Sequence, residues 1–125
     1  MKAGFAIGRL IYGGFFLYSG INHFLKRQAL AQYAGAKQVP SPEAAVVGSG
    51  AALVFGGANL MLGLNPRLGA AAIAGFLATA TPMMHDFWNV TDPNQRQNEM
   101  IHFSKNVALL GAATAFLSLD RDRRT

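Results

Sequence analysis

The sequence contains no cysteine, which excludes disulfide bonds, thiol redox chemistry, cysteine-ligated iron–sulfur clusters and covalent haem attachment. Charged residues are also scarce. They make up 14% of the 125 residues, whereas a soluble domain usually carries about 25%. The chain is therefore poor in the side chains that normally cover a water-facing surface. Its length allows one domain.

Charge is missing altogether from two long stretches, residues 44–64 and 68–84. A third apolar segment runs to Leu25 with Arg9 inside it, and a fourth runs to Leu119. A bilayer crossing needs roughly 20 mainly apolar residues, and all four segments fit. Buried helices of a soluble bundle would each keep a polar face, and these segments have almost none. The sequence therefore predicts membrane helices.

The net charge of +5 could indicate nucleic-acid binding, but the basic residues are scattered between the apolar segments and at the tail. A nucleic-acid site would gather them on one face. Attraction to anionic lipid headgroups accounts for this distribution. We therefore expect a lipid bilayer as a partner and no nucleic acid.

The apolar segments predict an all-α integral membrane protein, an up-down-up-down antiparallel four-helix bundle that forms one domain over residues 1–125. The polar connection 26–43 is expected to hold a short interfacial helix with Tyr33 facing the lipid. Thr91-Asp92-Pro93-Asn94 is interpreted as a turn. The four predicted helices cover about residues 4–25, 43–64, 68–85 and 97–119.

Small residues predict where these helices pack, because apolar burial alone does not drive helix association in lipid. Gly4 and Gly8 form a G-x-x-x-G pair in the first segment. The second segment has a small face that includes Gly56 and Asn59, and we expect Asn59 to donate a hydrogen bond to another helix. Pro82 removes a backbone donor from the third segment. Two interpretations of Pro82 remain open: it re-aims the helix end, or it opens a cavity.

Four crossings would place both termini on one side of the membrane. The ends on that side carry six basic residues and the opposite ends carry five, so the positive-inside rule favours cytoplasmic termini. The end of the first segment, the end of the third and the start of the fourth would then meet at the opposite face.

Titratable residues gather at that opposite face, and ionisable groups at membrane depth are costly and usually functional. We expect His85, Asp86, His102 and Lys105 to handle protons there, because histidine titrates near neutral pH. The candidate ligand-binding residues are Asn22, His23, Trp88, Glu99 and Asn106.

Each of these residues also has a structural interpretation. Trp88 could anchor the interface, and His23 could be only an amphipathic helix end. Lys105 could extend to the headgroups or pair with Asp86 or Glu99. Metal sites on helices usually combine several ligand pairs, and the sequence has a single Glu-x-x-His pair, so we predict neither a metal site nor a haem site.

Several short motifs occur in a distinctive order. They are Ser19-Gly20-Ile21-Asn22-His23-Phe24, Val39-Pro40, Met84-His85-Asp86-Phe87-Trp88, and Phe103-Ser104-Lys105-Asn106 with Gly111. In order and spacing they resemble the DoxX family over nearly the whole chain. The resemblance implies a small four-helix protein of the bacterial cytoplasmic membrane. That family takes its name from a subunit associated with thiosulfate:quinone oxidoreductase, and other members are tied to membrane redox complexes and oxidative-stress resistance.

The resemblance leads us to expect a subunit of a membrane redox system that interacts with quinone or a partner oxidoreductase at its histidine-rich end. If it takes part in catalysis, it would do so as an accessory subunit, and thiosulfate oxidation is not carried over because no sulfur-handling thiol is present. Quinone is the candidate cofactor. A redox subunit and a second copy of the chain are candidate partners. Two alternatives stay open: a binding or transport protein for a small apolar or weakly acidic solute, and a ligand-free scaffold.

Overall fold

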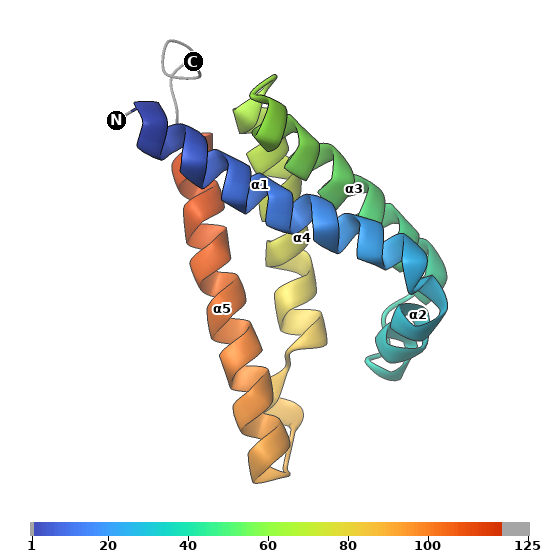
Figure 1. Ribbon diagram of the computed structural model, residues 1–125. Coiled ribbons are helices and arrows are strands. Elements are labelled where there is room, and N and C mark those ends of the chain that lie inside the picture. Colours follow the sequence, from blue (N-terminus) through green and yellow to red (C-terminus); the bar gives the residue numbers. More distant parts are fainter. Residues whose placement is uncertain (1, 119–125) are drawn as a thin grey trace.

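The computed structural model describes residues 2–118, which form helices joined by short connections, with no strand in that range (Figure 1). The all-α prediction is confirmed. The predicted helix end at residue 119 lies outside the described residues. The helices are α1 (Lys2–Leu25), α2 (Arg27–Ala36), α3 (Pro42–Leu62), α4 (Pro66–Met84), the short 3-10 helix η1 (Phe87–Asn89) and α5 (Pro93–Leu117).

Proline marks the start of three helices, because the first helical N–H has no partner and the ring fixes a helical φ. Pro42, Pro66 and Pro93 occupy this position in α3, α4 and α5. Asp92 caps α5 by accepting a hydrogen bond of 3.0 Å from the Gln95 amide. The predicted start at residue 97 was therefore wrong: the Asp92-Pro93 pair begins a helix and is not an isolated turn.

The helices are arranged as two diverging pairs rather than as a parallel bundle. α1 packs on α3, α3 on α4, and α4 on α5. The start of α1 and the end of α5 lie at one end of the molecule, and from there the α1–α3 pair separates from the α4–α5 pair (Figure 1). α2 contacts α3 and the end of α1. The structure thus has a fifth α-helix, α2, and does not confirm the predicted four-helix up-down bundle.

Glycines let α1 lie directly on the backbone of α3. A Cβ atom at Gly57 would lie 2.5 Å from the Leu17 amide nitrogen and 2.6 Å from the Gly13 carbonyl oxygen, so no side chain fits there. The predicted pair Gly4 and Gly8 is not used, since no described atom comes within 4 Å of a Cβ at either position. The G-x-x-x-G spacing alone did not identify the glycines that face a neighbouring helix.

Tyr12 adds a polar link between α1 and α5, because its hydroxyl donates a hydrogen bond of 2.5 Å to the Leu109 carbonyl. Asn59, expected to bond across helices, donates instead to the Phe55 carbonyl of its own helix at 3.0 Å. The buried core cluster consists of Phe16, Leu53, Leu60, Ile73, Leu77 and Ala113.

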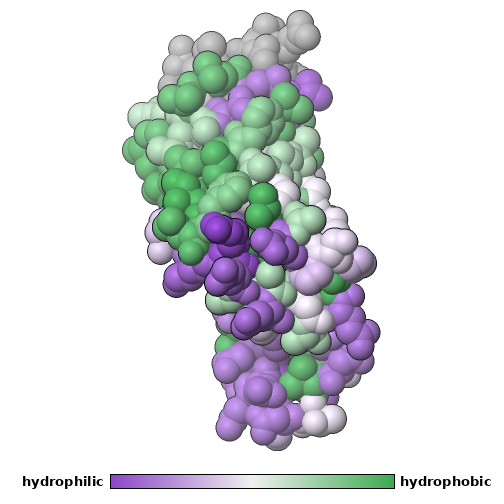
Figure 2. Space-filling view, turned by 90° about the vertical axis from the view of Figure 1, so that its right-hand side faces the viewer, coloured by the Kyte–Doolittle hydropathy of each residue, from purple (hydrophilic) through white to green (hydrophobic). Residues whose placement is uncertain are grey.

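Within residues 2–118, three helical segments are long and apolar enough to cross a membrane: Pro42–Leu62, Pro66–Asn89 and Pro93–Leu117. α1, which carries Arg9 within its apolar run, is not among them. In the view of Figure 2, hydrophobic residues cover most of the upper half of the molecule and hydrophilic residues most of the lower half. The prediction of membrane helices is confirmed for three of the four segments.

Candidate functional site

Five side chains form an ionic cluster that joins the connection after α2 to α4 and α5. Lys37 Nζ lies 2.7 Å from Asp86 Oδ1 and 3.4 Å from Glu99 Oε2. The other carboxylate oxygen of Glu99, Oε1, lies 3.3 Å from His85 Nδ1. The His85 ring stacks on His102 with 5.1 Å between ring centroids and 22° between planes. We call Lys37, His85, Asp86, Glu99 and His102 the ionic cluster.

Helix ends place the members of this cluster. Lys37 is the C-cap residue of α2 and His85 is the C-cap residue of α4, with Asp86 directly after it. Glu99 and His102 are three residues apart in α5, a spacing that puts both side chains on one face of the helix. Segments distant in the sequence thereby contribute one cation, two carboxylates and two imidazoles to the same place.

Lys37 and Tyr33 lie outside the three apolar segments, and the cluster affects both. The hydrogen bond to Asp86 raises the pKa of Lys37 above its ordinary value, and the bond to Glu99 acts in the same direction. The Tyr33 ring centroid lies 5.9 Å from Lys37 Nζ. Burial raises the pKa of Tyr33, and the negative charge of Glu99 raises it further. At neutral pH Lys37 is therefore a cation and Tyr33 a neutral phenol.

The structure brings together four of the predicted site residues: His85, Asp86, Glu99 and His102. Lys105 forms no ion pair within the described part of the chain, and the carboxylates that it was considered to pair with contact Lys37 instead. Sequence reasoning missed Lys37 because it lies 49 residues from Asp86 and 62 from Glu99. The available signal was indirect: two acids at one helix junction require a cation nearby.

The end of α1 does not join the ionic cluster. His23 lies 2.7 Å, through its Nδ1, from the Ser19 carbonyl oxygen of its own helix. Its ring meets Phe76 of α4 edge-on, with 5.8 Å between centroids. Asn22, the neighbouring candidate, lies in the same last turn of α1. The ends of α1, α4 and α5 were predicted to meet. The end of α4 and the start of α5 do so, but the third member of the ionic cluster's framework is the end of α2, which supplies Lys37.

Aromatic rings border the cluster on the side of η1. Trp88 packs against Phe87 and Phe103, with ring centroids 5.2 Å and 5.9 Å away. Half of the Trp88 side chain stays exposed, which fits the anchoring interpretation. Asn106 follows His102 by one turn of α5 and is partly buried.

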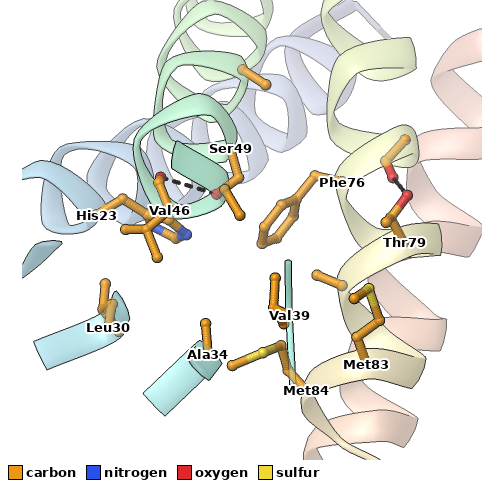
Figure 3. Close-up of a pocket in the computed structure, with 14 residues that line it drawn as sticks. His23, Leu30, Ala34, Val39, Val46, Ser49, Phe76, Thr79, Met83 and Met84 are labelled. Carbon is orange, nitrogen blue, oxygen red and sulfur yellow. Dashed lines mark hydrogen bonds between the residues drawn. The ribbon is translucent and has the colours of Figure 1, made fainter. Parts of the chain in front are cut away.

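An apolar pocket of about 280 Å³ lies between the end of α1, α2, α3 and the last turns of α4 (Figure 3). Such a volume is at the small end of ligand sites and holds about one substituted ring. The lining includes Met84, next to His85, and Ala34 and Val39, on either side of Lys37. The lining thus includes sequence neighbours of the ionic cluster but none of its five side chains. Pro82 is exposed and is not among the lining residues, so both interpretations of Pro82 stay open.

Within residues 2–118 no group of three or more histidine, aspartate or glutamate side chains is placed to hold a metal ion. The cluster can instead accept, donate and hold protons, because imidazoles and carboxylates lie within hydrogen-bonding distance of one another.

The chain was compared with known protein families, curated proteins and solved structures. The DoxX family model matches residues 4–86, from the first turn of α1 to Asp86, the second residue after α4. The resemblance that we noted around Phe103 and Gly111 lies beyond the matched range. No curated protein and no solved structure matches the chain. The match covers well over half of the chain, and with the apolar helices it identifies a multi-pass integral membrane protein. The chain belongs to the DoxX family.

Proposed function

We propose that this DoxX protein is an integral subunit of a membrane redox system and that it interacts with quinone, or with a partner oxidoreductase, at the ionic cluster. One observation carries the proposal: His85 lies between Glu99 and the stacked ring of His102, and its sequence neighbour Met84 lines an apolar pocket. A quinone has the matching character, an apolar ring whose oxygens take up protons.

Proton chemistry explains why these residue types suit the role. Reduction of a quinone to a quinol takes up two electrons and two protons; the partner oxidoreductase would supply the electrons. His85 and His102 would deliver protons, because imidazole titrates near neutral pH. Asp86 and Glu99 would set the charge around them, and Lys37 would hold the two carboxylates in place. The protein would then be an accessory subunit.

The surroundings of the cluster fit a position near the membrane surface. Trp88 would lie at headgroup depth with its two phenylalanine neighbours, and Lys105 would extend to the headgroups. We place the protein in the bacterial cytoplasmic membrane with both termini in the cytoplasm. A redox subunit or a second copy of the chain would complete the assembly.

Quinone titration of the purified protein in lipid nanodiscs tests the site. His85→Ala should weaken binding of a short-chain quinone at the ionic cluster by about fivefold, the effect of losing one net hydrogen bond. Asn94→Ala, at an exposed position in the first turn of α5, is the matched control and should bind as the native protein does. Unchanged binding in His85→Ala would contradict the site assignment.

A second candidate function is favoured by the pocket itself. An apolar pocket among apolar helices also suits a binding or transport protein for small apolar solutes. Flux of a panel of such solutes into proteoliposomes separates the two functions. Protein-dependent flux without any quinone binding would favour transport over the redox role.

A further inference from the structure

We infer that the pocket binds a neutral apolar ring compound through a hydroxyl group, as in a phenol or a quinol, in preference to the same skeleton with a carbonyl or ether oxygen. The inference rests on the proposed function only in naming the quinol as the natural member of this class. It follows from the few polar groups of the pocket. Each of their hydrogen atoms is already used in a hydrogen bond within a helix, so these groups can only accept a hydrogen bond from a ligand.

His23 is the most polar group of the lining, and its tautomer is determined by its partner. The Ser19 carbonyl oxygen, 2.7 Å from His23 Nδ1, can only accept a hydrogen bond, so Nδ1 carries the hydrogen. In the neutral imidazole, Nε2 then has a lone pair and no hydrogen. Figure 3 shows the ring beside Val46 at the pocket wall. His23 therefore offers the pocket an acceptor.

Two hydroxyl groups complete the polar lining. Ser49 Oγ donates to the Val46 carbonyl at 3.1 Å, and Thr79 Oγ1 donates to the Gly75 carbonyl at 2.8 Å (Figure 3). A hydroxyl has one hydrogen and two lone pairs. With the hydrogen used inside the helix, each hydroxyl can still accept but cannot donate without breaking its own bond.

No other donor reaches the pocket from the described residues that line it. The lining residues lie in helices, where the backbone N–H groups bond to carbonyls, except for Val39, whose N–H bonds to the Ala34 carbonyl at 3.0 Å. The thioethers of Met83 and Met84 are weak acceptors. Lys37 is close in sequence but does not line the pocket, and it directs its ammonium to Asp86 and Glu99.

An apolar pocket that offers only hydrogen-bond acceptors favours ligands that carry a hydrogen-bond donor. A ring with an O–H group gains a hydrogen bond at the pocket. A carbonyl or ether oxygen gains none, because it would have to take a hydrogen from a bond already made within a helix. A carboxylate or phosphate would lose its hydration and find no donor. Neutral hydroxyl compounds are therefore the favoured class.

The test uses a fluorinated para-alkylphenol and its methyl ether, which differ in the O–H hydrogen and one methyl group. Fluorine NMR titrations into the protein in nanodiscs are corrected with empty nanodiscs, because both probes enter lipid. We expect the phenol to bind about fivefold or more tightly than the ether, the effect of one net hydrogen bond. Equal binding, tighter binding of the ether, or no binding of either probe would overturn the inference.

Variants assign the effect to the pocket. His23→Phe keeps a ring against Phe76 but removes one of the three acceptors, so the phenol should lose part of its advantage over the ether; if this variant does not fold, Ser49→Ala combined with Thr79→Val removes the other two and should have the same kind of effect. All three substitutions together should bring the phenol to the affinity of the ether. Gly75→Leu should block both probes, because Gly75 lines the pocket and a Cβ there meets no described atom within 4 Å. Gly111→Leu, with equally open space but on α5, is the control and should leave both affinities unchanged. A phenol preference that is undiminished without these acceptors, or that persists in Gly75→Leu, would overturn the inference.

A quinol and its quinone, titrated in the same way, separate this inference from the proposed function. Tighter binding of the quinone that is lost in Gly75→Leu would overturn the hydroxyl preference and support the redox role. A phenol preference without binding of quinone or quinol would support the pocket chemistry and contradict the redox role.

Discussion

Asp86 and Glu99 direct one carboxylate oxygen each at the same ammonium group, that of Lys37. Without this cation, two negative charges would face each other at the junction of α4 and α5, with only the His85 imidazole to balance Glu99. Like charges at such short range raise the free energy of the folded state. At the residue scale, the order of the cluster depends on a side chain from a distant helix.

Replacing that cation tests its role. Lys37→Met keeps the length of the side chain and removes the charge, so we expect a loss of about 1 kcal/mol in stability, the upper range for partly exposed ion pairs. Thermal unfolding in mild detergent, followed by circular dichroism, measures the change. Lys26→Met is the control: Lys26 is exposed and makes no ion pair within residues 2–118. Equal effects of the two substitutions would contradict the role of Lys37.

The raised pKa of Lys37 also predicts a pH dependence. Folding binds this proton more tightly, so the stability contributed by the ion pair is complete below the ordinary lysine value of 10.5 and is lost as the pH rises through the folded pKa. The difference in unfolding temperature between the native protein and Lys37→Met should stay constant from about pH 7 to about pH 10 and shrink above that. A difference that already disappears near neutral pH would show that another group controls it.

At the scale of elements, contact between glycine backbones fixes how α1 lies on α3. Gly57→Ala would place a methyl group against the α1 backbone at 2.5 Å, and we expect the helices to separate at a cost of about 1–3 kcal/mol. Gly48→Ala is the matched control in the same helix, because its Cβ would meet no described atom within 4 Å. It should be neutral or stabilising by up to about 1 kcal/mol, since alanine favours helix. Thermal unfolding of both variants measures the difference in stability, and equal stability of the two would contradict the close contact at Gly57.

The hydrogen bond from the Tyr12 hydroxyl to the Leu109 carbonyl links α1 to α5. Tyr12→Phe should lower stability by about 1 kcal/mol, the net value of one such bond. Tyr18→Phe, at a position that is 69% exposed, should change nothing. If Tyr12→Phe unfolds at the same temperature as the native protein, this bond does not hold α5 against α1.

The sequence predicted the elements far better than their arrangement. Uncharged runs and proline at helix starts are local signals, so the long helices were found within a few residues at most ends. The mutual orientation of helices depends on which small residues face a neighbour. Gly4 and Gly8 have the expected spacing, yet Gly57 makes the close contact, because facing direction is decided by both partners together.

For the candidate site too, individual residues were predictable but the contacts between them were not. His85, Asp86, Glu99 and His102 stood out because ionisable groups next to apolar segments are rare. Lys37 did not, since a lysine in a polar connection is ordinary until the fold places it. His23 had a histidine's chemistry but belongs to the pocket wall, a feature that only the packing of four helices creates.

At the scale of the whole molecule, the number of crossings is the open prediction. The absence of cysteine makes single-cysteine labelling clean. With four crossings, Ala3→Cys and Asn65→Cys should react with a membrane-impermeant maleimide from the cytoplasmic side, and Gln28→Cys and Asn94→Cys from the other side. If α1 does not cross, Ala3→Cys will react from the same side as Gln28→Cys. Labelling of oriented membrane vesicles measures this.

The family match ends at Asp86, so the ionic cluster straddles its boundary. Lys37, His85 and Asp86 lie inside the matched range, while Glu99 and His102 come from α5 beyond it. The cluster is thus assembled by docking α5 onto the matched part of the chain.

The pocket is lined mainly by α3 and α4 within their apolar spans, and this location changes which concentration matters for binding. An apolar hydroxyl compound partitions strongly into the bilayer, so its local concentration around these helices far exceeds its concentration in water. A site that binds weakly on the scale of the lipid phase would still be well occupied, and it would release its ligand quickly. Such a site is suited to exchange with a pool dissolved in the membrane, where turnover depends on fast release more than on tight retention.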